Sequence, residues 1–247
     1  MFKMIVFDMD GTLTPSKWKM QDEMVVLFKK LLKKYKVAII SWWKYELFQQ
    51  QVLPHLWNDS SILENLYVCP TCSTAMYLYR NWEWHKEYSL DLSKEERIHI
   101  INVLNNAIDK LNLKPEKIWW EMVEDRITQI TISTLWQEAP LEEKKKYDPD
   151  FTKRQKIRDY MLPDLKWYNV LVCWTTSIDV TREWVDKAYW VKKLSEVSWI
   201  KLNEMIFVWD AVFPWWNDYP PLEIWVTTKR IFSIEDTMEY IKFLIEG

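Results

Sequence analysis

The sequence predicts an α/β protein in which a doubly wound parallel sheet is interrupted by an inserted α+β domain. Near both ends of the chain, short apolar runs alternate with stretches that have apolar residues at helical spacing, an order typical of parallel sheets. In the middle, short alternating runs indicate an antiparallel sheet with helices. The expected domains are a core of residues 1–89 and 184–247 and an insert of residues 90–183.

The first part of the core is expected to contain two buried parallel strands, each followed by a helix. The apolar runs at residues 3–10 and 37–41 predict the strands. Apolar side chains at helical spacing predict helices at residues 20–35 and 44–56. The segment 73–92 is expected to form a hairpin that turns near residue 81.

The insert is expected to begin with a helix, because Ser93 can cap it with Glu96 three residues later. Residues 141–165 are charged and are predicted to be helical in part, and the basic run from Lys144 to Arg158 predicts a solvated helix face. The expected strands of the insert are residues 125–134, 168–174 and 176–181.

The parallel pattern returns after the insert. Residues 185–197 are expected to be a helix, and residues 204–210 are expected to be a buried strand that ends in Asp210. A second strand is expected at residues 222–227, followed by a closing helix at residues 233–247.

Composition excludes several classes of function. The chain has 247 residues, of which 49% are hydrophobic, so it can bury a sizeable core. Its net charge of -3 leaves no basic excess for a nucleic acid partner. It has no run of about 18 apolar residues, so no membrane span is expected. Three cysteines, an odd number, fit a reducing compartment, and the expected location is the cytoplasm.

Polar side chains follow the predicted parallel strands. Asp8 and Asp10 end the first strand, Ser41 ends the second, and Asp210 ends a later one. In open α/β sheets, ligands bind outside the carboxyl ends of the strands. One carboxylate can attack phosphorus, and a second can serve as general acid and base. Clustered carboxylates favour a hard cation such as Mg²⁺, and Lys187 could balance the remaining negative charge.

The segment FDMDGTLT, residues 7–14, resembles the first motif of the haloacid dehalogenase superfamily of phosphotransferases. Ser41, Lys187 and residues 207–218 resemble the second, third and fourth motifs, in the expected order. The resemblance covers nearly the whole chain. It implies a Rossmann-like core with an inserted α+β cap of the C2 type, the large cap of the subclass, IIB, that includes phosphomannomutases and sugar phosphatases.

The resemblance also implies roles for the residues at the strand ends. Asp8 is the expected nucleophile and Asp10 the expected acid/base. Mg²⁺ is expected to bind Asp8, Asp210 and the Asp10 carbonyl, and the transferred phosphoryl group is expected to bind Ser41 and Lys187. The resemblance assigns accessory roles beside the metal to Asn217 and Asp218.

Two segments of the insert resemble phosphomannomutases. SIDV, residues 177–180, resembles their SFDV, and DRITQITIS, residues 125–133, resembles their FRNGMLNVS. By that likeness Arg126, Ser177 and Asp179 face the sugar from the cap.

The expected function is therefore Mg²⁺-dependent hydrolysis of a phosphosugar through an aspartyl-phosphate intermediate. A phosphomannomutase is the alternative, and mutases of this kind commonly pair as homodimers through their caps. The mutases carry a further phosphate-binding arginine where this chain has Gln137, and this difference favours the phosphatase.

The balance of glycine and tryptophan is abnormal. The chain has 2 glycines and 18 tryptophans, whereas average usage predicts roughly 17 glycines. In the predicted hairpin, glycine is the usual residue after Asn81, where this chain has Trp82. The family pattern has glycine at Trp42 or Trp43, Trp174, Trp184, Trp209, Trp215 and Trp216.

We hypothesise that these codons are UGA, which some genetic codes read as glycine and others as tryptophan. Glycines in such loops let backbone N–H groups approach phosphate and metal, whereas tryptophan rings would fill the site. If the tryptophans are genuine, a third reading applies, in which the protein is a binding protein without catalytic activity.

Overall fold

The computed structural model describes residues 2–15, 18–56, 60–113, 122–135, 143, 146–173, 176–185, 187–210 and 226–247, with the backbone alone at residues 187 and 188. The chain divides into two compact units, one formed by Met1–Ser89 with Asp186–Gly247 and one by Leu90–Val185. We call them the core unit and the insert unit. No helix in the described ranges has the length and apolar character needed to cross a membrane.

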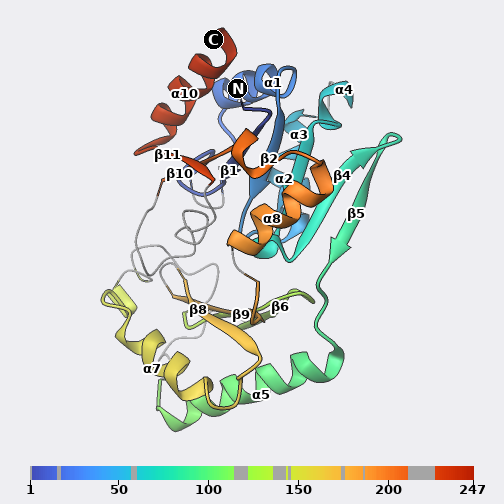
Figure 1. Ribbon diagram of the computed structural model, residues 1–247. Coiled ribbons are helices and arrows are strands. Elements are labelled where there is room, and N and C mark those ends of the chain that lie inside the picture. Colours follow the sequence, from blue (N-terminus) through green and yellow to red (C-terminus); the bar gives the residue numbers. More distant parts are fainter. Residues whose placement is uncertain are drawn as a thin grey trace. The chain divides into compact units, whose positions relative to one another are not determined.

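The core unit is built on a seven-stranded sheet with the order β11-β10-β1-β2-β3-β4-β5 (Figure 1). The five strands from β11 to β3 are parallel, and β4 and β5 are antiparallel. This sheet confirms the predicted α/β fold class. The strands are β1 (Met4–Asp8), β2 (Lys36–Ile40), β3 (Leu66–Cys69), β4 (Ala75–Arg80), β5 (Glu83–Ser89), β10 (Met205–Trp209) and β11 (Thr227–Arg230).

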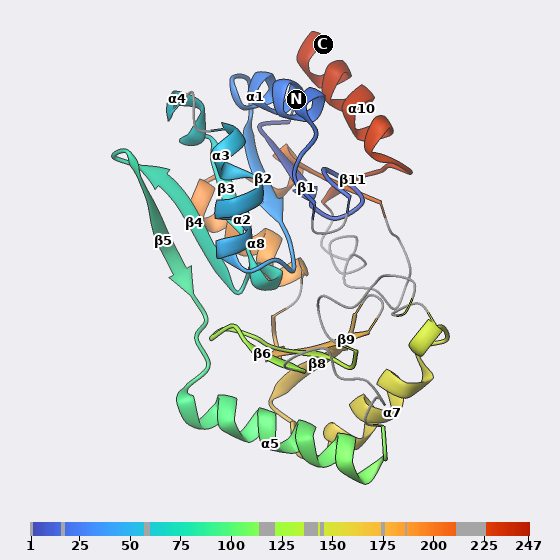
Figure 2. The same ribbon diagram turned by 180° about the vertical axis from the view of Figure 1, so that it is seen from behind.

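Helices cover both faces of this sheet, because its central strands are apolar on both sides. On β1, Ile5 and Phe7 belong to one apolar cluster, and Met4 and Val6 belong to another. The first cluster is completed by α1 and α10, which lie side by side, and the second by α8 (Figures 1 and 2). The helices are α1 (Asp22–Leu32), α2 (Tyr45–Gln51), α3 (Leu53–Leu56), α4 (Ser60–Leu63), α8 (Lys187–Ser198) and α10 (Ile234–Glu246).

Three elements of the core differ from the prediction. The helix expected over residues 44–56 is divided into α2 and α3 at Val52, close to Pro54, which has no backbone N–H to donate. The strand β3 was not predicted, since a run of four apolar residues has too little periodicity to identify. Most of the strand expected at 222–227 lies outside the described residues, and β11 begins at Thr227.

The insert unit is a four-stranded antiparallel sheet with two helices packed on one face (Figure 2). Ile130, Ile132, Ile178 and Val180 point into the apolar cluster shared with the helices. The capping box predicted at Ser93 is confirmed. The elements are α5 (Lys94–Lys110), β6 (Val123–Asp125), β7 (Ile130–Ser133), α7 (Thr152–Met161), β8 (Tyr168–Val172) and β9 (Ser177–Arg182), with the sheet order β6-β7-β9-β8.

The predicted solvated face of the basic run is wrong for Arg154. Its side chain is 1% exposed and its Nε lies 2.7 Å from Oδ2 of Asp148, which is fully buried. The guanidinium also donates to the backbone carbonyls of Asp148 and Cys173. A buried charge needs such a partner and such hydrogen bonds. The ion pair therefore holds α7 to the turn before it, and the hydrogen bond to the Cys173 carbonyl joins the helix to the residue after β8.

Two tryptophans of the core unit have a left-handed backbone. Asn81 and Trp82, with φ of 51° and 69°, form the two-residue loop between β4 and β5. Trp199, with φ of 59°, directly follows α8. Both are positions where glycine is the usual residue, the first in a hairpin loop and the second after a helix. Their side chains are 75% and 92% exposed, so ring packing does not offset the strain.

The other described tryptophans at expected glycine positions differ from Trp82. Trp42, Trp43, Trp184 and Trp209 are absent from the described residues with positive φ, so their backbones are not strained in this way. Left-handed backbone strain therefore supports glycine at positions 82 and 199. At positions 42, 43, 184 and 209, the argument for glycine rests on the space that the tryptophan side chains occupy.

Replacing Trp82 or Trp199 by glycine should raise the free energy of unfolding by about 1 kcal/mol each, because the left-handed backbone is no longer strained. Chemical denaturation of the full chain measures this. The matched control is Trp167→Gly, since Trp167 is 77% exposed without a positive φ; this change should lower stability by about 0.5–1 kcal/mol through added flexibility of the unfolded chain. Equal effects at all three positions would contradict the backbone argument.

Candidate active site

Three of the predicted site residues lie at the carboxyl ends of neighbouring strands. Asp8 is the last residue of β1 and is paired with Ile40, so Ser41 follows at the adjacent strand end. On the other side of β1, β10 runs parallel with Phe7 paired with Val208, and Asp210 comes two residues later. The parallel register therefore brings these three side chains to one edge of the sheet, in the order Asp210, Asp8, Ser41.

Asp210 lies directly against the loop that follows β1. A Cβ atom added to Gly11 would lie 2.3 Å from Oδ2 of Asp210, and Gly11 has a φ of +79°. Only glycine satisfies both conditions. The loop itself is closed by the Met9 carbonyl, which accepts hydrogen bonds from the backbone N–H groups of Leu13 at 2.9 Å and Thr14 at 3.1 Å. The loop after β1 and Asp210 are thus in contact at Gly11.

Trp43 occupies the space between Ser41 and Asp10. Its indole Nε1 donates to both carboxylate oxygens of Asp10, at 3.2 and 3.0 Å. Its backbone N–H donates to Ser41 Oγ at 3.1 Å. The ring is 3% exposed and packs against Phe48 with 5.6 Å between ring centroids. The Trp43 ring therefore fills part of the site, as expected for a tryptophan where the family has glycine. It also binds Asp10, the expected acid/base.

The remaining predicted core residues are only partly described. Lys187 is the first residue of α8, and its side chain lies outside the description. Asn217 and Asp218 fall within residues 211–225, outside the described residues, as do Trp215 and Trp216.

The oxygen atoms at this edge suit a hard divalent cation. The carboxylates of Asp8 and Asp210 and the carbonyl of Asp10 are the donor types that Mg²⁺ prefers, and the Gly11 approach lets the Asp210 carboxylate reach the loop. Among the described residues, no cluster of three or more His, Cys, Asp or Glu side chains has metal-binding geometry. The fit to Mg²⁺ therefore depends on two carboxylates completed by a backbone carbonyl.

Within the insert unit, the second face of the small sheet is polar. Thr131, Asp179 and Ser177 alternate with the apolar residues of β7 and β9, and Thr131 is paired with Asp179. Arg126, just after β6, donates to Glu124 Oε2 at 2.7 and 3.1 Å, and its side chain is 8% exposed. The cap residues that the sequence singled out thus share one surface of the unit, except that Arg126 is already held by a carboxylate.

Asp179 has an unusual environment. Burial raises the pKa of its carboxyl group, and the charge of Arg126 only partly opposes this. Cys173 donates its thiol to Oδ2 at 3.3 Å. Oδ1 is buried without a hydrogen-bond partner in the described part of the chain. An unsatisfied buried carboxylate oxygen is costly and is well suited to accept a hydroxyl from a ligand.

Sequence reasoning missed the contribution of the cysteines. The sequence analysis assigned no role to Cys173, but the pairing of β8 with β9 brings it beside Asp179. Alternation in the two strands is the signal that could have revealed this contact. Cys69 and Cys72 form no disulfide.

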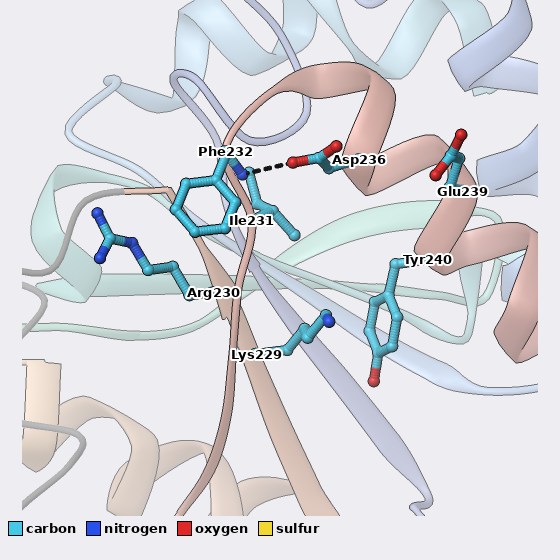
Figure 3. Close-up of a pocket in the computed structure, with 7 residues that line it drawn as sticks. All are labelled: Lys229, Arg230, Ile231, Phe232, Asp236, Glu239 and Tyr240. Carbon is cyan, nitrogen blue, oxygen red and sulfur yellow. Dashed lines mark hydrogen bonds between the residues drawn. The ribbon is translucent and has the colours of Figure 1, made fainter.

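A separate hollow of about 280 Å³ lies along β11 and the start of α10 (Figure 3). Three of its charged groups are already engaged within the protein. Arg230 lies over the Phe232 ring and Lys229 over the Tyr240 ring, and Asp236 accepts the Phe232 N–H at 2.9 Å. The carboxylate edge is therefore the stronger candidate for catalysis.

Curated relatives of this chain include phosphomannomutases. Phosphomannomutase 1 of Mus musculus is 23% identical over 245 residues, covering 95% of this chain and 88% of that protein. The phosphomannomutase of Spinacia oleracea is 25% identical over 246 residues, covering 95% of this chain and 92% of that protein. No model of a known protein family matches the chain.

Solved structures share the fold over almost the whole chain. The IMP-nucleotidase of Plasmodium falciparum in its IMP-bound form has a TM-score of 0.71 at 16% identity, covering 100% of this chain and 68% of that one. The trehalose-6-phosphate phosphatase of Aspergillus fumigatus has a TM-score of 0.60 at 15% identity, with 100% and 93% covered. A haloacid dehalogenase-like hydrolase of Bacteroides thetaiotaomicron has a TM-score of 0.63 at 13% identity, with 99% and 100% covered.

The motif order, the sheet that carries it and these similarities agree: the chain is similar in sequence to phosphomannomutases over 95% of its length, and it shares its fold with a haloacid dehalogenase-like hydrolase.

Proposed function

We propose that the protein is a Mg²⁺-dependent phosphohydrolase that acts on a phosphosugar through an aspartyl-phosphate intermediate. The observation that carries this proposal is the meeting of Asp8, Asp210 and Ser41 at one edge of the sheet, with Asp210 against Gly11. A nucleophilic carboxylate, a second carboxylate and a hydroxyl at the carboxyl ends of parallel strands suit phosphoryl transfer.

In the first half of the proposed reaction, a carboxylate oxygen of Asp8 attacks the phosphorus. The bond from phosphorus to the sugar oxygen breaks, and Asp10 gives its proton to that oxygen. In the second half, Asp10 takes a proton from water as the water oxygen attacks the phosphorus. The bond from phosphorus to Asp8 then breaks, and inorganic phosphate leaves.

Negative charge on the phosphoryl oxygens must be balanced throughout. When bound by Asp8, Asp210 and the Asp10 carbonyl, Mg²⁺ supplies electrostatic stabilisation of these oxygens. Ser41 donates a hydrogen bond to the phosphoryl group, and Lys187 contributes a positive charge. Asn217 and Asp218 are proposed as accessory groups beside the metal.

The insert unit is proposed to act as a cap that selects the substrate. Ser177, Arg126 and Asp179 would bind sugar hydroxyls, and the unpartnered Oδ1 of Asp179 supports this role. Closure of a cap would exclude water or admit a second acceptor. We further propose a cytoplasmic protein, in keeping with its odd number of cysteines, that pairs as a homodimer through the cap.

A phosphomannomutase is the second candidate, favoured by the named relatives. In that case the acceptor is a sugar hydroxyl instead of water. Adding a hexose bisphosphate separates the two: a mutase interconverts hexose 1- and 6-phosphates, whereas a phosphatase only releases phosphate. Gln137, where the mutases have arginine, is the sequence difference that supports the phosphatase.

The third candidate, an inactive binding protein, is favoured by the Trp43 indole on the Asp10 carboxylate. An indole N–H shared by both oxygens of this carboxylate competes with substrate and water for the group. This candidate requires a genuine tryptophan at position 43.

Asp8→Asn should lower phosphate release by at least about 1,000-fold, because an amide cannot form the acyl phosphate. Phosphate release from hexose phosphates measures this, with EDTA as a second arm that should abolish activity until Mg²⁺ is restored. The control is Asp22→Asn, at an exposed position in the first turn of α1, which should leave turnover unchanged. Turnover that survives Asp8→Asn would refute the mechanism.

Asp179→Asn should raise KM for the phosphosugar by about tenfold, through loss of a charged acceptor. It should also change how stability depends on pH. A carboxyl with a raised pKa holds its proton more tightly when folded, so its contribution to stability falls as pH rises from the ordinary carboxyl range through the raised pKa. The variant should therefore match the parent in acid and exceed it near neutral pH, as measured by denaturation. A stability difference independent of pH would contradict this assignment.

Trp43→Gly should raise turnover by roughly 100-fold, since general acid–base catalysis contributes at least that much and the change releases Asp10. Trp43→Phe separates the two effects of the side chain, because it keeps a ring against Phe48 and removes the N–H. If only Trp43→Gly raises turnover, the ring itself blocks entry of the substrate. If Trp43→Phe raises turnover as well, the indole hydrogen bond is what restrains Asp10. No gain with either variant would exclude Trp43 as the obstacle.

A further inference from the structure

The turn after β3 has a strained backbone that the proposed mechanism does not use. Thr71, Cys72 and Ser73 have φ of 48°, 53° and 63°, three consecutive residues in the left-handed region. None of them is glycine, asparagine or aspartate, the residues that tolerate this region best, and each costs roughly 1–2 kcal/mol. Strain of this kind persists only where surrounding interactions enforce it, and such sites cluster where function needs fixed geometry.

Buried hydroxyl groups hold the turn in this shape. Thr74 Oγ1 donates to the Thr71 carbonyl at 2.7 Å, and Thr71 Oγ1 lies 2.7 Å from Thr74 Oγ1. Since the Thr74 proton is used on the carbonyl, the Thr71 hydroxyl is the donor of the second bond. The Tyr88 hydroxyl donates to the Ser73 carbonyl at 2.9 Å. Thr71 is 5% exposed and Thr74 is fully buried, so both bonds are shielded from water.

The turn is hydrogen-bonded to the segment that contains Ser41. The N–H of Cys72 donates to the Ser41 carbonyl at 3.0 Å, and the N–H of Thr71 donates to the Trp43 carbonyl at 2.9 Å. In the opposite direction, the Ser41 N–H donates to the Cys69 carbonyl at 3.1 Å. All three bonds join backbone atoms, so they form whether positions 42 and 43 carry tryptophan or glycine.

These bonds fix the orientation of two peptide groups. In a planar trans peptide, the C=O and the following N–H point in opposite directions. Because the carbonyls of Ser41 and Trp43 point to the turn beyond β3, the N–H groups of Trp42 and Lys44 point away from it. In the strand order β1-β2-β3, the side away from β3 is the side of Asp8.

We propose that residues Thr71–Thr74 form a clamp that positions the Ser41–Lys44 backbone to receive the phosphoryl group, with Thr74 as its central positioning residue. This inference rests on the proposed function, because it assigns a ligand to those backbone N–H groups. It also gives a role to the sequence CPTC, residues 69–72, in which the backbone N–H groups of Thr71 and Cys72 are the donors.

Thr74→Val tests the clamp, because valine keeps the branched shape and removes the hydroxyl. With the full chain and Mg²⁺ present, inorganic phosphate should bind about tenfold more weakly to this variant by calorimetry. KM for a phosphosugar should rise by a similar factor, more than kcat falls. Thr74→Ser, which keeps the hydroxyl, should restore the parent values.

Thr237→Val is the matched control for stability. Thr237 is fully buried in α10, and its hydroxyl also donates to a backbone carbonyl, that of Ser233. This variant should lose comparable stability and bind phosphate as the parent does. Unchanged phosphate binding in Thr74→Val, or equal weakening in Thr237→Val, would overturn the clamp alone. A parent protein that binds no phosphate would overturn the proposed function and the clamp with it.

Discussion

The close approach of Asp210 to Gly11 is the contact on which the candidate site depends. Any side chain at position 11 would place a Cβ 2.3 Å from the Asp210 carboxylate and would also be strained at a φ of +79°. Without this approach, Asp210 would be pushed away from the loop that contains Asp10, and the proposed cation site would lose one of its carboxylates. The parallel register of β10 with β1 then sets the position of Asp210 relative to Asp8 at the carboxyl ends of the two strands.

Much of this edge is built from backbone groups in unusual conformations. Gly11 and the turn at Thr71–Ser73 are left-handed, and both stand at the carboxyl ends of the parallel strands. A site of this kind relies on amide groups that must come close to a ligand, so it is sensitive to the size of every loop side chain. Trp43 illustrates this, because its backbone is ordinary and its side chain still reaches the Asp10 carboxylate.

The glycine hypothesis and the enzyme proposal therefore support each other. Trp82 and Trp199 lie in left-handed positions on the hairpin and after α8, where strain alone argues for glycine. Trp43 stands in the site, where the need for space argues for glycine. If the protein is made with glycine at these three positions, the left-handed strain is removed, the carboxylate edge is opened and the number of glycines rises from 2 to 5.

The order of the core elements was predictable because its apolar runs and helical spacings are long, and the Ser93 capping box is a local signal. The convergence of Asp8, Ser41 and Asp210 followed from the rule that parallel strands end at one edge. Features that depend on side-chain packing were not predictable. β3 is too short to identify by period, Arg154 pairs with Asp148 inside the insert unit, and Cys173 reaches Asp179 only through the β8–β9 register.

The most direct test of the central claim is to trap the intermediate on the protein purified from its native source. The protein is mixed with a phosphosugar and Mg²⁺, treated with borohydride, digested and sequenced by mass spectrometry. Reduction of an acyl phosphate converts the aspartate to homoserine. The account predicts homoserine at position 8 and nowhere else. Homoserine at another acidic residue, or at none while phosphate is being released, would contradict it.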